Sequence, residues 1–187
     1  MKKVVARSGV TGDVPARFTT AEFLHMTASG AFDDMYVELV DGELQRVNRP
    51  MSNHAWRQSR LSAMLWQAVE GTALQVFSDA GIDLGADTVR GFDVCIASMR
   101  PETSRLLQPG EIVLAIEIAE TSIARDLGPK RLAYAVAGIP HYWVVDSDRC
   151  ITHIFGGPEN GNYTAENIVK FGEPLIVPGT DQVIAVA

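Results

Sequence analysis

Two acidic residues interrupt the most apolar runs of the chain. Asp93 lies in Phe92–Ile96 and Glu117 lies in Ile112–Ala119. Apolar and β-branched residues on both faces of the second run predict a central strand covered on both sides. An ionised carboxylate in such a strand is costly unless something pairs with it, and a metal ion is a common solution. The alternatives are a turn cap at the end of a strand for Asp93 and an arginine or lysine partner for Glu117.

Lys130 adds a third functional group on the helix predicted after the second run. Phosphodiester hydrolysis needs an activated water and positive charge at the phosphorus. Carboxylate oxygens bind Mg²⁺ or Mn²⁺, and a lysine can orient or deprotonate the water. Asp93 and Glu117 as metal ligands, with Lys130 beside them, therefore predict a metal-dependent nuclease-like hydrolase. Taken alone, Lys130 is more typical of a solvated helix residue.

The pair Asp41-Gly42 between two alternating segments predicts a β-hairpin. A two-residue loop places Glu38 opposite Gln45 and puts Glu38 and Glu43 on the same face. That face either brings two carboxylates to the site or faces solvent.

The remaining pattern predicts an α/β fold in one domain over residues 18–187, after a loose leader over residues 1–17. A loop is expected from Glu120 to Gly128, followed by a helix from Pro129 to Gly138 with Leu132, Tyr134 and Val136 facing inward. Strand, helix and strand then form a βαβ unit that ends with His141–Asp146. Further strands are predicted near the C-terminus.

Charge and cysteine content narrow the possible functions. The net charge of −7 has the wrong sign for general phosphate attraction, although a metal and a local basic strip could compensate for it. Cys95 and Cys150 lie in strand-like context without zinc-site spacing, and we expect both to be reduced core thiols. No apolar run is long enough to span a bilayer, and we expect a cytoplasmic protein.

Several blocks of the chain together resemble the Uma2 family of the PD-(D/E)XK nuclease superfamily. The resemblance extends roughly from Phe18 to Phe155, and the blocks are Val37–Glu43 with Ser52–His54, Gly91–Val94, Ala115–Ile118, Asp126–Tyr134 and Ala137–Asp146. It implies a restriction-endonuclease-like mixed β-sheet flanked by helices, with an N-terminal hairpin and extra C-terminal strands. The lysine that the superfamily places two residues after the glutamate is Ala119 here, and the resemblance implies that Lys130 replaces it.

The same resemblance implies roles for the other candidate residues. Asp93 and Glu117 would bind Mg²⁺ or Mn²⁺, Glu38 and Glu43 would face the site, and Glu43 is the preferred third carboxylate. His54 would contact a phosphate or relay a proton, although a capping or packing role is equally open. The implied partner is DNA or another nucleic acid. The alternative is a catalytically idle nuclease-fold module that acts through interactions, and a homodimer is the expected assembly.

Overall fold

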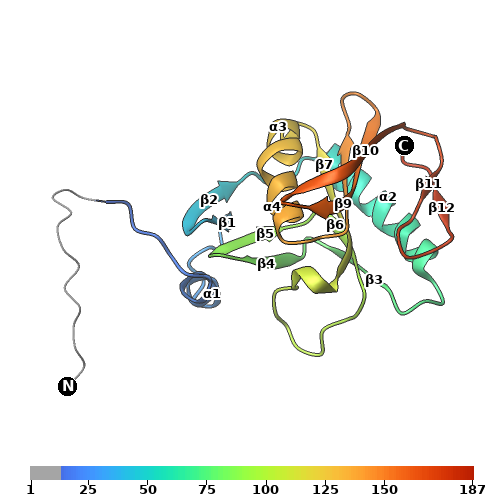
Figure 1. The fold of residues 1–187 in the computed structure, drawn as a ribbon. Helices are drawn as coiled ribbons and strands as arrows, with labels where there is room; N and C mark the ends of the chain where they lie inside the picture. Colours follow the sequence, from blue (N-terminus) through green and yellow to red (C-terminus); the bar gives the residue numbers. More distant parts are fainter. Residues whose placement is uncertain (1–13) are drawn as a thin grey trace, which may run out of the picture.

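The main sheet of the protein is mixed and central, as predicted (Figure 1). The computed structural model describes residues 14–187. The sheet has six strands in the order β10-β9-β8-β7-β6-β3, of which only the β7–β8 pair is parallel. Its strands are β3 Gln75–Ser78, β6 Val94–Ala97, β7 Ile112–Ala119, β8 His141–Asp146, β9 Ile151–Glu159 and β10 Asn162–Lys170.

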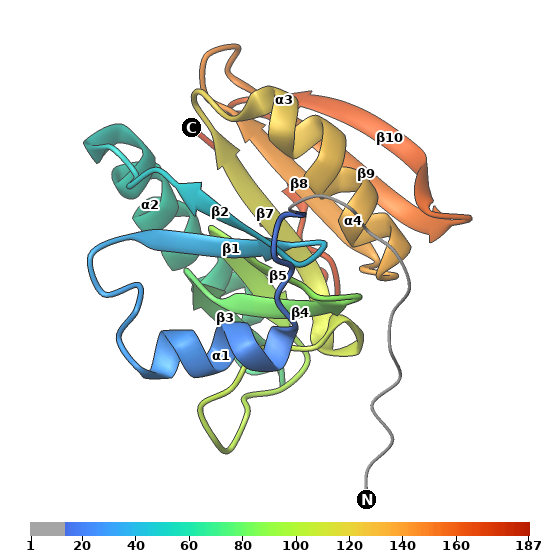
Figure 2. The same ribbon diagram turned by 90° about the vertical axis from the view of Figure 1, so that its left-hand side faces the viewer.

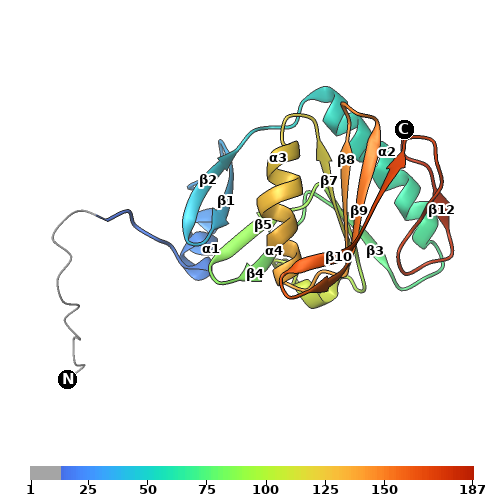
Figure 3. The same ribbon diagram turned by 45° about the horizontal axis from the view of Figure 1, so that its top comes forward.

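Helices cover both faces of this sheet (Figure 3). Helix α2 (Ser52–Val69) lies on one face, and α3 (Ile123–Arg125), the helical turn η2 (Asp126–Lys130) and α4 (Arg131–Val136) lie on the other. Side chains alternate along β7, so Leu114 and Ile116 belong to the core that includes α2, while Ala115 belongs to the core that includes α4. Glu117, two residues after Ala115, lies on the same face of the strand as Ala115. The strand pattern thus places Glu117 beneath the helical segment that carries Lys130.

A four-stranded sheet, in the order β2-β1-β5-β4, forms the N-terminal part of the described structure (Figure 2). Its strands are β1 Tyr36–Val40, β2 Glu43–Val47, β4 Gly81–Gly85 and β5 Thr88–Gly91, and helix α1 (Thr20–Ala28) packs against it. The contact buries Phe23 of α1 with Leu39 and Val89 of the sheet. A two-stranded sheet of β11 (Leu175–Ile176) and β12 (Val183–Ile184) completes the predicted extra C-terminal strands, and a short 3-10 turn, η1 (Pro109–Glu111), precedes β7.

The hairpin forms in the predicted register. Glu38 pairs with Gln45 and Val40 with Glu43. Asp41 and Gly42 both have positive φ, 50° and 80°, as a type I′ turn requires.

The division of the chain at residue 17 stays a prediction, because residues 1–13 lie outside the described residues.

The apolar run that carries Asp93, Phe92–Ile96, does not form one continuous strand. Strand β5 ends at Gly91 and β6 begins at Val94, so Phe92 and Asp93 form the joint between the two larger sheets. The chain changes sheet at this joint, which a continuous apolar pattern does not reveal. Asp93 therefore occupies the junction of the two sheets.

The predicted loop before Pro129 is also wrong, because the helical segment already begins at Ile123. Pro129 lies inside the π-helical turn η2. A proline has no N–H to donate and crowds the preceding turn, and a local π-helical turn accommodates it within the helix. This wider turn buries both Asp126 and Lys130.

Two smaller predictions of burial are wrong, because some of the side chains concerned are exposed. Tyr134 of α4 is buried as predicted, but Leu132 and Val136 are exposed. Cys95 is buried in β6, whereas Cys150 is exposed with a φ of 54° after β8.

None of the helices within residues 14–187 has the length and apolar character that crossing a bilayer requires.

We predict that the core between α2 and the central sheet supplies much of the stability. Leu65 is fully buried there, while Leu132 is 43% exposed. Leu65→Ala should lower the free energy of unfolding by about 2–5 kcal/mol, because it leaves a cavity. Leu132→Ala should change it by less than about 1 kcal/mol. Urea unfolding followed by circular dichroism measures both values, and equal losses would contradict this description of the core.

Candidate active site

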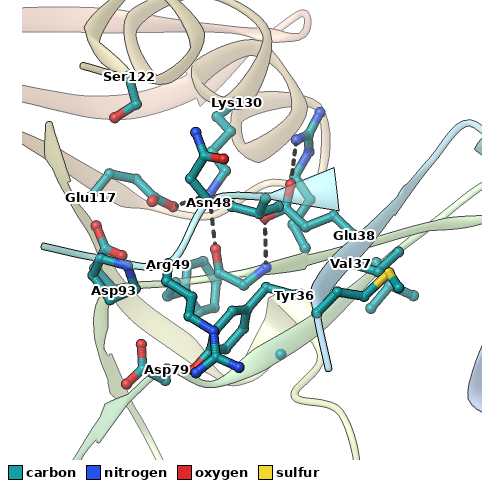
Figure 4. Close-up of a pocket in the computed structure, with 18 of the residues that line it drawn as sticks. Tyr36, Val37, Glu38, Asn48, Arg49, Asp79, Asp93, Glu117, Ser122 and Lys130 are labelled. Carbon is teal, nitrogen blue, oxygen red and sulfur yellow. Dashed lines mark hydrogen bonds and ion pairs between the residues drawn. The ribbon is translucent and has the colours of Figure 1, made fainter. Parts of the chain in front are cut away.

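Asp93 and Glu117 come together at the junction of the two sheets. Strands β6 and β7 are antiparallel, with Val94 opposite Ile116. Asp93 precedes Val94 and so stands opposite Glu117, on the same face of the sheet; Cβ atoms of such opposed residues lie about 5 Å apart. Both side chains line one cavity, and Figure 4 shows them next to each other.

Glu117 is held by two buried groups from the helix above it. Its Oε1 lies 3.0 Å from Lys130 Nζ and accepts a hydrogen bond of 2.8 Å from the Tyr134 hydroxyl. Burial raises the pKa of Glu117 to about 8, although the charge of Lys130 acts in the opposite direction. For Lys130, burial opposes the charged form, but the carboxylates of Glu117 and Glu38 outweigh it and raise the pKa. Burial likewise raises the pKa of Tyr134, so its hydroxyl remains a donor.

Lys130 also reaches the N-terminal sheet. Its Nζ donates to the backbone oxygen of Gly91 at 3.0 Å and lies 3.4 Å from Glu38 Oε1. Glu38 in turn accepts hydrogen bonds from Arg90 Nη1 and from the backbone N–H of Gly91, both at 3.1 Å. Glu38 is therefore buried and paired, so the hairpin face that carries it is not a solvent face at this position.

Asp93 is positioned by a histidine and a backbone donor. Its Oδ2 accepts a bond of 2.6 Å from the N–H of Ile118 and lies 3.1 Å from His54 Nε2. This hydrogen bond to Asp93 raises the pKa of His54. Gln58, one turn further along α2, donates to the backbone oxygen of Asp93 at 2.8 Å. His54 thus orients Asp93, and its own Nδ1 is buried without a partner among the described residues.

The cavity shared by these residues has a volume of about 540 Å³. Its lining includes more carboxylates than basic side chains. The acidic residues are Asp33, Glu38, Asp79, Asp93, Glu117 and Glu120, and the Lys and Arg residues are Arg49, Arg90, Arg125 and Lys130. Because Arg90 and Lys130 are already paired with Glu38 and Glu117, the cavity carries an excess of negative charge that favours a bound cation.

Two carboxylate oxygens are available for such a cation. Within residues 14–187, neither Asp93 Oδ1 nor Glu117 Oε2 has a hydrogen-bond partner. Some side-chain atoms in this range are fully buried without a partner, but these two oxygens are not among them. No three His, Cys, Asp or Glu side chains in this range converge into a complete metal-binding group. Mg²⁺ commonly uses one or two carboxylates and completes its shell with water and substrate phosphate, so the pair fits this type of ion.

Glu43, the preferred third carboxylate, is not brought to this site. It is exposed, pairs with Arg17 at 2.9 Å and does not line the cavity. It shares a face with Glu38, as the register predicted, but it lies two residue positions nearer the turn, about 7 Å along the strand. The side chains that the structure brings together are thus Glu38, His54, Asp93, Glu117 and Lys130.

Sequence reasoning missed two residues that hold the site together, Arg90 and Tyr134. Tyr134 was expected only to pack, and Arg90 lies in β5, which was not predicted. A usable signal existed for Arg90, because Glu38 stands between Val37 and Leu39 and a buried carboxylate needs a cation. Two further arginines, Arg49 and Arg125, also line the cavity, while Arg57 of α2 donates to the backbone of Ala187.

Comparison with known proteins identifies the family and the fold of the chain. The model of the Uma2 family, described as "Putative restriction endonuclease", matches residues 20–187. The fold is similar to the crystal structure of "a putative nuclease belonging to DUF820" from Anabaena variabilis ATCC 29413, with a TM-score of 0.70 and 17% identity over 90% of this chain and 95% of that chain. No curated protein matches.

The structural similarity confirms the nuclease fold that the sequence blocks implied, and at this identity it shows the fold alone. The family match covers nearly all of the chain, including the hairpin, the sheet junction and the helix that carries Lys130. The chain belongs to the Uma2 family.

Proposed function

We propose that the protein is a nuclease-like hydrolase that cleaves phosphodiester bonds with a divalent cation held by Asp93 and Glu117. The observation that carries the proposal is the convergence of these two carboxylates, each with one free oxygen, in a cavity that also contains Lys130. The family model that matches the chain is described as "Putative restriction endonuclease", and it supports the same class of reaction. Magnesium or manganese is the cation that such an oxygen pair suits.

A bound cation would polarise the phosphate and lower the pKa of a coordinated water. The residues of the chain would then hold this arrangement in place. His54 and the Ile118 N–H fix the orientation of Asp93, and Tyr134 fixes that of Glu117. Preorganised ligands of this kind avoid reorganisation during the reaction.

Lys130 is proposed to orient the attacking water and to balance charge at the phosphate. Its Nζ donates a hydrogen bond to the backbone oxygen of Gly91 and forms ion pairs with Glu117 and Glu38. The contact to Glu38 is the longest at 3.4 Å. Glu38 also has Arg90 as a second partner, so exchanging this contact for a water leaves no buried carboxylate unpaired.

The second candidate is the catalytically idle interaction module. The acidic lining and the complete pairing of Lys130 favour it, because both oppose the approach of a phosphate in the absence of a cation. A homodimer would suit either candidate and stays a prediction. Cleavage and cation binding discriminate between the two.

We predict cation-dependent cleavage that requires the two converging carboxylates. The wild type should cut single-stranded DNA, plasmid DNA or RNA in Mg²⁺ or Mn²⁺, and Glu117→Gln and Asp93→Asn should each lower the rate by about 100-fold or more. Glu43→Gln removes a carboxylate outside the cavity and should retain the wild-type rate. Gel analysis of labelled substrates measures all four proteins. Cleavage that persists in both cavity variants would show that these residues do not catalyse it.

We also predict that the protein binds a divalent cation without any substrate. Saturating Mn²⁺ at about 100 times its Kd should stabilise the wild type by about 2.7 kcal/mol, because the ion binds only the folded state. That corresponds to a rise in Tm of roughly 5–11 °C for a domain of this size. Glu117→Gln should lose the shift and Glu43→Gln should keep it in differential scanning fluorimetry. The absence of a shift in the wild type at millimolar Mn²⁺ would favour the idle module.

A further inference from the structure

The cavity has a second, apolar compartment that metal-dependent hydrolysis does not use. It is continuous with the carboxylates but lies between α1 and the N-terminal sheet, and its lining includes Phe23, Leu24, Phe32, Met35, Val37 and Leu106. Most of these side chains belong to or pack against the small core of that sheet. Phe23, Leu39 and Val89 at the centre of that core are buried, whereas several of the side chains around them are only partly buried and also line the cavity.

Two aromatic rings form part of this compartment. Phe23 and Phe32 stack at a centroid distance of 5.7 Å with an interplanar angle of 28°. Leu24 follows Phe23 on α1 and is 42% exposed. An apolar surface that stays open beside buried charges is costly in water and is typical of a ligand-binding cavity.

Arg49 and Tyr36 lie between the two compartments. The Arg49 guanidinium carbon is 5.4 Å from the centroid of the Tyr36 ring, and that tyrosine is 52% exposed. Figure 4 shows this pair between Val37 on one side and Asp93 on the other. A cation next to an accessible ring is a combination that binds phosphate and stacks on a base.

We propose that the apolar compartment binds one unpaired nucleobase of the substrate while the adjoining phosphate faces Asp93 and Glu117. The inference rests on the proposed function, and it specifies the substrate class as single-stranded or locally unpaired nucleic acid. The chemistry of the two compartments matches the two parts of a nucleotide, an apolar planar base and an anionic phosphate. Asp33, at the apolar end, offers an acceptor for the amino group of a base.

The dimensions and the charge of the cavity favour an unpaired base over a duplex. A volume of about 540 Å³ is that of a small-ligand cavity. A base inside a duplex is stacked and cannot enter such a cavity unless it is extruded, which costs energy that an unpaired base does not require. The overall charge of −7 also opposes the general phosphate attraction on which tracking along a duplex depends.

Binding can be tested separately from cleavage, in Ca²⁺, with labelled ten-nucleotide strands and fluorescence anisotropy. The wild type should bind an oligodeoxyadenylate at least about tenfold more tightly than the same backbone with abasic sites, and more tightly than a duplex of the same length. Leu24→Glu places a charge at the mouth of the apolar compartment and should abolish the tenfold ratio. Leu132→Glu makes the same change at a residue of equal exposure outside the cavity and should preserve it.

Equal binding of the base-containing and abasic strands by the wild type would overturn the inference, as would a ratio that survives in Leu24→Glu or a duplex that binds as tightly as the single strand. These outcomes are distinct from failure of the proposed function. If base-dependent binding is found but no cation-dependent cleavage occurs, hydrolysis is refuted and the base compartment stands. Cleavage of abasic and base-containing strands at equal rates refutes the compartment alone.

Discussion

The buried ammonium group of Lys130 connects the parts of the molecule that must meet for a site to exist. Its three acceptors come from three different strands: Glu38 in β1, Gly91 at the end of β5, and Glu117 in β7. Removing Lys130 would leave the buried carboxylate of Glu117 without its cation, which costs several kcal/mol. The N-terminal sheet, the central sheet and the helical segment with the π-helical turn are therefore held in one arrangement by a single charge.

The same charge cluster determines what the cavity can bind. Lys130 and Arg90 satisfy the inner oxygens of Glu117 and Glu38, and His54 satisfies one oxygen of Asp93. The oxygens that remain free face a cavity with an excess of carboxylates, which favours a bound cation and disfavours an anion that enters alone. Next to them, several of the partly buried apolar side chains around the small core under α1 also line the cavity. A polar centre with an apolar compartment at its side is the arrangement expected for a ligand that is itself part charged and part apolar.

The sequence predicted those features that depend on local rules. Asp41-Gly42 gave the turn and the register of the hairpin, because the type I′ geometry is set by two residues. Glu117 was recognised because a carboxylate inside an apolar strand needs a partner wherever it lies. Long-range pairing was harder. Glu43 was assigned to the site because it shares a face with Glu38, whereas it pairs with Arg17. Arg90 was missed because contacts between residues far apart in the chain have no local signature. The predicted start of the helix that carries Lys130 was too late, because a proline is common at the first position of a helix. In the structure Pro129 lies inside a π-helical turn.

Crystals grown or soaked with Mn²⁺ provide the most direct test of the central claim, since manganese can be located by its anomalous scattering. We predict one strong anomalous peak between the carboxylates of Asp93 and Glu117, within about 2.0–2.6 Å of an oxygen of each. A cavity without a peak, or a peak held by Asp79 or Glu120 while Glu117 stays bound only to Lys130 and Tyr134, would contradict it.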